Sequence, residues 1–88
     1  MQIIFKKSFL KSLQKIIDQK TWNEFAAIIA EVEHASRITD VQNTKKLKGY
    51  KQFYRIRSGS YRIGIQVEDD TVTFAAFDHR KAIYKHFP

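Results

Sequence analysis

The chain has 88 residues and a formal net charge of +7 at pH 7, with 43% hydrophobic residues, three glycines and one proline. This composition is too apolar for a disordered chain, and a chain of this length builds one hydrophobic core, so we expect a single domain over residues 1–88. The sequence contains no cysteine, which excludes disulfide bonds, thiolate metal sites and a cysteine nucleophile and is typical of a reducing, intracellular compartment.

The first part of the chain predicts a strand followed by two helices. Residues 2–5 are β-prone and form the first expected strand. A second helix is expected to open at Thr21, because residues 21–24 have the spacing of a capping box. The short link at 18–20 then predicts an antiparallel helical hairpin. The first helix is expected from Ser8, its proposed N-cap, because apolar residues recur at steps of three and four, namely Phe9, Leu10, Leu13, Ile16 and Ile17.

The second part of the chain predicts a sheet. Residues 36–51 show no clear period and are expected to form a loop. From residue 53 the period changes to two, so 53–57 and 61–67 predict a hairpin around a turn at 58–60. A turn at 68–70 and a third strand at 71–77 follow. The predicted class is therefore α+β, with an N-terminal strand, a helical hairpin, an antiparallel three-stranded meander (order β-α-α-β-β-β) and a short C-terminal segment.

Positive charge is concentrated in the expected sheet. Residues 1–44 carry 6 Lys and Arg against 5 Asp and Glu, a net +1, whereas residues 45–88 carry 10 against 4, a net +6. Alternation turns Tyr54, Ile56 and their apolar counterparts towards the helices, so the basic residues project from the other, open face. Like charges on one face repel, which indicates a surface for an anionic ligand such as a phosphate. The residues concerned are Arg55, Arg57 and Arg62.

Three sequence blocks resemble the RelE/ParE toxin superfamily of bacterial type II toxin-antitoxin systems. They are L-K-G at 47–49, Y-R-I-R-S-G-S-Y-R-I at 54–63 and H-R-K-A-I-Y at 79–84. The resemblance implies a RelE-like fold and, in the RelE branch, an endoribonuclease (mRNA interferase) that cuts messenger RNA on the ribosome without metal or cofactor. It implies attack of the ribose 2′-OH on the adjacent phosphate, which gives a 2′,3′-cyclic phosphate.

The resemblance also implies site residues. It associates the basic positions and Tyr84 with transition-state charge, proton transfer and stacking on a base. From side-chain chemistry we assign proton transfer to His79, because an imidazole titrates near 6.5 and a phenol near 10, and stacking to Tyr84. The link between Phe77 and Arg80 is shorter than in the best-known RelE members, so it stays open which family cation His79 or Arg80 replaces. The catalytic candidates are Arg55, Arg57, Arg62, His79, Arg80 and Tyr84.

Further basic residues are candidates for RNA contact. Solvated lysines in the loop and after the last strand suit the phosphates of RNA or of the ribosome. We assign no role to His34, at the end of a helix, or to His86, among the last three residues. The RNA-binding candidates are Lys45, Lys46, Lys48, Lys51 and Lys81.

Two other functions remain open at this point. A ParE-type toxin has the same fold but poisons DNA gyrase and needs no acid and base. A basic nucleic-acid-binding domain without activity would show the same charge. The expected partners are a cognate acidic antitoxin, messenger RNA and the ribosome. No segment approaches the length that spans a bilayer and no secretion signal is evident, so we expect no membrane partner and a cytoplasmic location.

Overall fold

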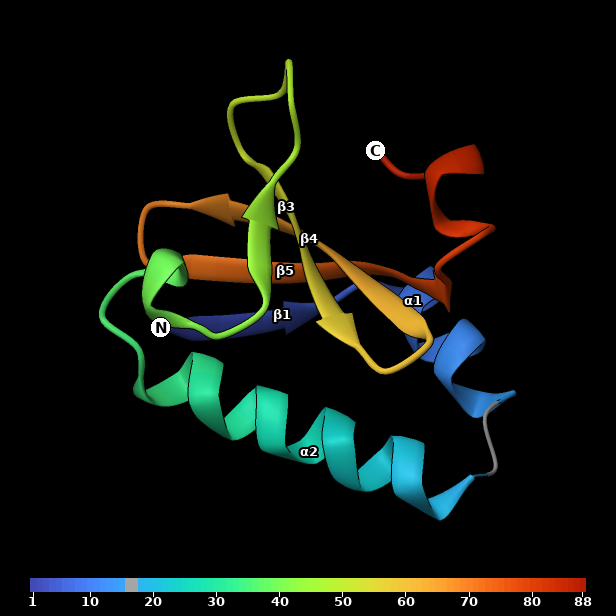
Figure 1. Ribbon diagram of the computed structural model, residues 1–88. Coiled ribbons are helices and arrows are strands. Elements are labelled where there is room, and N and C mark those ends of the chain that lie inside the picture. Colours follow the sequence, from blue (N-terminus) through green and yellow to red (C-terminus); the bar gives the residue numbers. More distant parts are fainter. Residues whose placement is uncertain (16–17) are drawn as a thin grey trace.

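The computed structural model describes residues 1–15 and 18–88, which form a five-stranded sheet flanked by helices (Figure 1). The strands lie in the order β1, β5, β4, β3, β2. β1 runs parallel to β5, and the other neighbours are antiparallel, so the predicted meander β3-β4-β5 forms the centre of the sheet. The strands are β1 (Gln2–Phe5), β2 (Thr44–Lys46), β3 (Phe53–Ser58), β4 (Tyr61–Glu68) and β5 (Thr71–His79).

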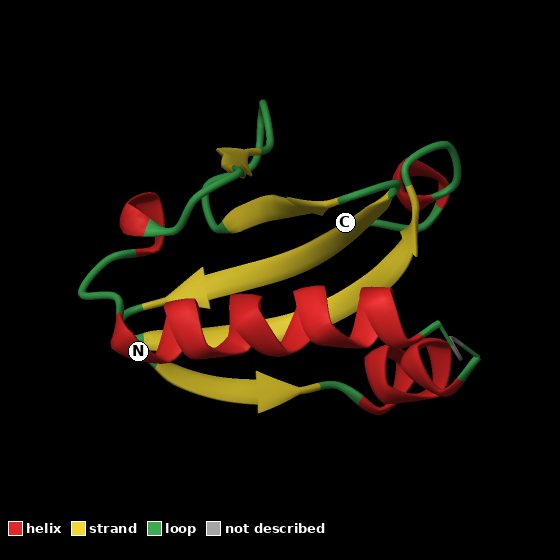
Figure 2. Ribbon diagram, turned by 60° about the horizontal axis from the view of Figure 1, so that its bottom comes forward, coloured by secondary structure: helices red, strands yellow, loops and turns green. Residues whose placement is uncertain are grey.

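Two helices follow β1. α1 (Lys7–Gln14) packs against β5, and α2 (Gln19–His34) lies across one face of the sheet (Figure 2). The helices meet through the rings of Phe9 and Phe25, whose centroids are 5.6 Å apart. Ile16 and Ile17, which the sequence assigned to the first helix, lie outside the described residues.

Both expected helix starts are wrong. α1 begins at Lys7, before the proposed cap Ser8, because the Lys6 backbone N–H still donates to Phe74 O (3.0 Å) and the chain turns directly after it. α2 begins at Gln19 instead of at Thr21, and its cap is Asp18. The Asp18 carboxylate accepts hydrogen bonds from the backbone N–H of Lys20 (3.2 Å) and from the Thr21 hydroxyl (2.8 Å). A carboxylate is a strong acceptor at a helix N-terminus, so Thr21 donates to the cap instead of serving as one.

The expected loop at 36–51 contains structure. Ile38–Asp40 forms a helical turn, and β2 pairs antiparallel with β3. Ile38 and Val41 are buried in the core and hold this segment against the sheet. β2 has only three residues, which is too short for an alternating pattern to be visible in the sequence.

The main core lies between the sheet and the helices. Its centre is aromatic, with ring centroids of Phe9 and Phe25 between 5.6 and 6.2 Å from those of Phe74 and Phe77 on β5. Aromatic pairs at such spacings add to the stabilisation from burial alone. The apolar positions of the predicted hairpin also face this core, as alternation predicted, and the fully buried ones are Ile56, Ile63 and Ile65.

A second, smaller core covers part of the opposite face, so the expectation of a wholly open face is wrong. There the C-terminal segment, residues 80–88, packs Ile83 and Phe87 against Ala76 and Phe53. Gly64 makes this possible, because a Cβ at that position would lie 2.6 Å from the Phe87 ring. The absence of a side chain at Gly64 therefore leaves room for the Phe87 ring against β4.

Candidate active site

One face of the sheet gathers the basic residues of β2, β3 and β4. Arg57 lies directly opposite Arg62 across β3 and β4, and Arg55 lies opposite Lys45 across β2 and β3. Directly opposed residues of antiparallel strands project to the same side. These four residues therefore share the side of the sheet remote from α2, which we call the cationic face. The prediction that the three arginines share a face is confirmed.

Arg62 lies at the centre of this arrangement. Its Nη1 donates hydrogen bonds to Gly59 O (3.0 Å) and to Tyr61 O (2.9 Å), which hold the guanidinium over the β3-β4 turn. Partial burial lowers the pKa of Arg62, and the nearby positive charges of Arg55, Arg57 and Arg80 lower this pKa further; the charge of an ionised Tyr84 acts in the opposite direction.

Arg57 is held by a residue that the sequence did not single out. Its Nη2 donates to the Asn43 side-chain oxygen (3.1 Å), and its backbone N–H donates to the Asn43 carbonyl (3.0 Å). Asn43 has a φ of 63°, a left-handed conformation that asparagine tolerates better than most residues. Asn43 therefore both bends the chain into β2 and fixes the direction of Arg57.

The C-terminal segment brings Arg80 and Tyr84 to the same place. The Arg80 backbone N–H donates to Ser60 O (2.9 Å), which ties the start of the segment to the β3-β4 turn. Ile83 is fully buried, whereas the neighbouring Tyr84 is 56% exposed. Since the charges of Arg80 and Tyr84 both act on Arg62, five of the six catalytic candidates lie around one point.

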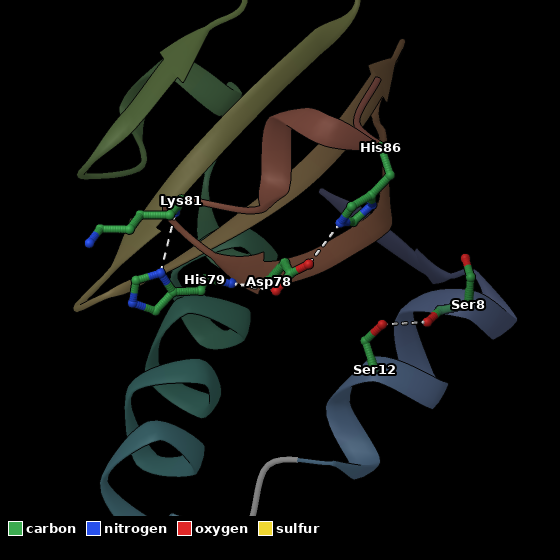
Figure 3. A network of polar contacts seen from close by, with 6 residues as sticks. All are labelled: Ser8, Ser12, Asp78, His79, Lys81 and His86. Carbon is green, nitrogen blue, oxygen red and sulfur yellow. Dashed lines mark hydrogen bonds and ion pairs between the residues drawn. The ribbon is translucent and has the colours of Figure 1, made fainter.

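His79 is the exception. It lies opposite Tyr61 at the end of β5, and its ring centroid is 6.1 Å from that of Tyr61. Neighbouring residues of a strand project to opposite sides, so His79 shares the helix-covered side with Tyr61, whereas Arg62 points the other way. Its Nδ1 accepts from the backbone N–H of Lys81 (3.3 Å) (Figure 3). The geometry does not support the assignment of proton transfer at Arg62 to His79.

Asp78 and His86 form a pair that the sequence did not suggest. Asp78 lies opposite Arg62 across β4 and β5, and its Oδ2 is 2.9 Å from His86 Nε2 (Figure 3). Partial burial would raise the pKa of Asp78, but hydrogen bonds from His86 and from the His79 backbone N–H, together with the charges of both imidazoles, keep this pKa below its ordinary value. Alternation along β5 could have placed Asp78 on the cationic face; nothing local marked His86 as its partner.

The five lysine candidates are dispersed. Lys45 lies on the cationic face, whereas Lys46, opposite Tyr54, projects to the other side. Lys48 and Lys51 are exposed in the connection between β2 and β3, and Lys81 is exposed after β5. The strand register thus supports Lys45 and not Lys46 as a neighbour of the arginines.

Two further properties concern the described part of the chain. Within residues 1–15 and 18–88, no three His, Asp or Glu side chains come together in a way that could hold a metal ion. None of the helices in these ranges has the length and apolarity needed to cross a bilayer.

The arrangement suits chemistry at a phosphate. Guanidinium groups keep their charge at working pH and bind phosphate oxygens in a bidentate manner. The phenol of Tyr84 adds a group that can exchange a proton close to Arg62. Fixed cations beside a proton-exchanging group are the parts that phosphodiester cleavage requires.

The chain belongs to the ParE toxin family. The pattern of that family, described as "ParE toxin of type II toxin-antitoxin system, parDE", matches residues 3–84. Over its whole length the chain is 42% identical to Toxin RelE3 of Methanocaldococcus jannaschii, and the match covers all of that protein as well. The resemblance to the RelE/ParE superfamily is therefore confirmed, and the protein is a toxin of RelE type.

Solved structures give the same result for the fold. The RelB-RelE antitoxin-toxin complex from Methanococcus jannaschii matches with a TM-score of 0.80 and 40% identity, over 97% of this chain and 99% of that chain. The RelBE complex of E. coli matches with a TM-score of 0.70 and 27% identity, over 89% and 94%. The archaeal RelE-RelB complex of Pyrococcus horikoshii, at 22% identity and a TM-score of 0.74 over 90% and 93%, shares the fold. The predicted RelE-like α+β class is confirmed.

Proposed function

We propose that this toxin is an endoribonuclease that cleaves translated messenger RNA on the ribosome, without a metal, and therefore acts in the cytoplasm. The observation that carries the proposal is the gathering of Arg55, Arg57 and Arg62 on one side of the sheet, with Arg57 directly opposite Arg62. Positive charges held this close repel one another, and a doubly negative phosphorane relieves that repulsion. The site therefore stabilises the transition state, in which negative charge builds up on the phosphate, more than it stabilises the bound substrate.

The reaction follows from these groups. The ribose 2′ oxygen attacks the adjacent phosphorus and loses its proton to a base, while the bond from phosphorus to the 5′ oxygen of the next nucleotide breaks. That oxygen leaves with a proton from an acid, and the products are a 2′,3′-cyclic phosphate and a 5′-OH. The guanidiniums of the cationic face stabilise the charge on the phosphorane.

Proton transfer is assigned to Tyr84. Its hydroxyl lies near enough to Arg62 for its charge to act on that guanidinium, whereas His79 projects to the other side of the sheet. Tyr84→Phe keeps the ring and removes the exchangeable proton, so we expect it to abolish cleavage while RNA binding survives. His79→Ala is expected to cleave normally. The reverse pattern would return proton transfer to His79.

A cognate antitoxin is the expected partner. The RelE proteins of Methanococcus jannaschii and E. coli were solved in complexes with RelB. This chain carries a net charge of +7, so we infer that an acidic antitoxin segment folds onto it and neutralises the cationic face. Co-expression with the product of the neighbouring gene should restore growth. A neighbouring product that neither binds nor restores growth would contradict this partner.

The deciding experiment compares three toxins during induced expression. They are wild type, the Arg62→Ala/Arg80→Ala variant and a Lys7→Ala/Lys11→Ala control, which loses the same charge from exposed positions on α1. RNA ends are mapped by primer extension. We expect new ends within translated codons for wild type and control and none for the arginine variant. Cuts that persist in the arginine variant would overturn the proposed site.

A second function is favoured by one observation, the match to the family described as ParE. A gyrase poison would arrest growth without cutting messenger RNA, and double-strand DNA breaks would accumulate. The same expression experiment separates the two functions. A basic binding domain without activity would produce neither arrest nor cuts.

A further inference from the structure

The C-terminal segment is anchored on both sides of Tyr84. Ile83 is fully buried before it, and Phe87 is 5% exposed after it. The Phe87 ring lies against Gly64 and has its centroid 5.6 Å from that of Phe53. Between these two apolar anchors, Tyr84 is exposed and depends on the segment as a whole for its position.

A polar contact acts at the same end of the segment. His86 precedes the anchor Phe87 directly, and its Nε2 is 2.9 Å from Asp78 Oδ2. The Asp78 carboxylate is itself fixed, because its Oδ1 accepts from the His79 backbone N–H at 2.7 Å. Figure 3 shows His86 pointing from the C-terminal segment towards Asp78 on β5. A hydrogen bond adds a direction that packing of a phenylalanine ring lacks.

Asp78 also connects the pair to the reaction centre. It lies directly opposite Arg62 on the neighbouring strand, so one rigid pair of strands carries both the central guanidinium and the acceptor for His86. The distance between Arg62 and Tyr84 therefore depends on how the segment is attached to Asp78.

We propose that Asp78 and His86 are a positioning pair, which fixes the C-terminal segment so that the Tyr84 hydroxyl stays beside Arg62. This inference rests on the proposed function only for its kinetic consequence, since the position of Tyr84 can be measured without any reaction. The pair is not expected to contact the scissile phosphate or the nucleobase, and it acts through Tyr84.

The test uses three variants of the whole chain. His86→Ala removes the bond, and His86→Gln retains a side-chain N–H that can donate to Asp78. His34→Ala is the matched control, because His34 is also exposed and its Nδ1 bonds to the Ala30 carbonyl of its own helix (2.9 Å). Each protein is labelled with fluorotyrosine, and the Tyr84 signal among the four tyrosines is assigned with Tyr84→Phe. Fluorine NMR then reports the surroundings of Tyr84 directly.

We expect His86→Ala to shift and broaden the Tyr84 signal, His86→Gln to restore most of it and His34→Ala to leave it unchanged. In ribosome-dependent cleavage, His86→Ala should lower kcat on the order of tenfold with KM nearly unchanged, because small misplacements of a reacting group are costly and Arg55, Arg57 and Arg62 lie on β3 and β4, outside the C-terminal segment.

An unchanged Tyr84 signal in His86→Ala would overturn the positioning pair whether or not wild type cleaves RNA. A shifted signal with unchanged kcat would support the positioning of Tyr84 and contradict the assignment of proton transfer to Tyr84. A wild type that cleaves no RNA, combined with a shifted signal, would contradict the proposed function and leave the positioning intact.

Discussion

The Phe87 ring occupies the space in which a side chain at Gly64 would lie, so the ring fits there only because residue 64 is a glycine. A Cβ added at Gly64 would lie 2.6 Å from the Phe87 ring, well inside contact distance. The atoms that it would meet include Cγ, at the base of the ring, so rotation of the ring alone does not relieve the overlap. The attachment of the C-terminal segment thus depends on a residue in the middle of β4.

We expect Gly64→Ala to destabilise the protein by about 1 to 3 kcal/mol, the usual cost of overpacking. The variant should also release the C-terminal segment. Urea unfolding gives the first effect, and hydrogen exchange at residues 83–87 gives the second.

A double-mutant cycle with Phe87→Ala provides the control for this expectation. Once the ring is absent, the three atoms nearest to the added methyl group are removed, so the two changes should cost less together than the sum of the single changes. Additive costs would show that Gly64 does not act through Phe87.

Acid should remove the stabilisation that Asp78 provides. Its pKa in the folded protein lies below the ordinary value, so the ionised form is favoured by folding. The contribution is therefore present above the unfolded pKa of about 3.9 and is lost as the pH falls through the lower, folded pKa. We expect the difference in unfolding free energy between wild type and Asp78→Asn to shrink as the pH falls below about 4. A difference that grows in acid would contradict the sign of the shift.

The two neighbouring lysines of β2 should behave differently in RNA binding. Lys45 shares the cationic face, whereas Lys46 projects to the other side. Each phosphate contact with a single strand contributes about 0.7 to the slope of log K against log salt, so Lys45→Ala should reduce the slope by about this amount. Lys46→Ala should leave it unchanged. Fluorescence anisotropy with a short single-stranded RNA, at several salt concentrations, measures both. Equal effects would place the RNA path along the edge of β2 and not across the face.

Asn43 offers a test of how far Arg57 depends on its support. Asn43→Gly keeps the positive φ and removes the amide, whereas Asn43→Ala removes the amide and also strains the turn. Both variants should weaken RNA binding by a similar, few-fold amount, because both free the Arg57 guanidinium. Only Asn43→Ala should lower the unfolding temperature. Unchanged RNA binding in Asn43→Gly would show that Arg57 needs no tether.

The sequence predicted those parts of the site that repeat with a local period. Alternation through 53–67 identified the arginines of the cationic face and their common side, because side-chain direction in a strand depends only on position. It carried no information on β2, since three residues show no period and their place depends on distant apolar anchors, Ile38 and Val41.

Contacts between distant residues were missed for the same reason. The hydrogen bond between Asp78 and His86 joins β5 to the C-terminal segment, after the chain has turned. No sequence spacing predicts such a contact. His79 was chosen for its chemistry, but a single step along β5 decided that Asp78 and not His79 faces Arg62. The cap of α2 could have been predicted locally, because the carboxylate of Asp18 is a stronger acceptor than a hydroxyl and lies three residues before Thr21.

The parallel pairing of β1 with β5 has a consequence for synthesis. Gln2 pairs with Thr71, so the first paired position lies 69 positions (71 − 2) from its partner in the sequence. Such a contact forms late, because closing a long loop costs entropy before the pairing repays it. While the chain emerges from the ribosome, the first strand made has no neighbour until the last strand arrives. The sheet that carries the arginines is thus completed only after translation has passed β5, which delays the appearance of an ordered site until all five strands have been made.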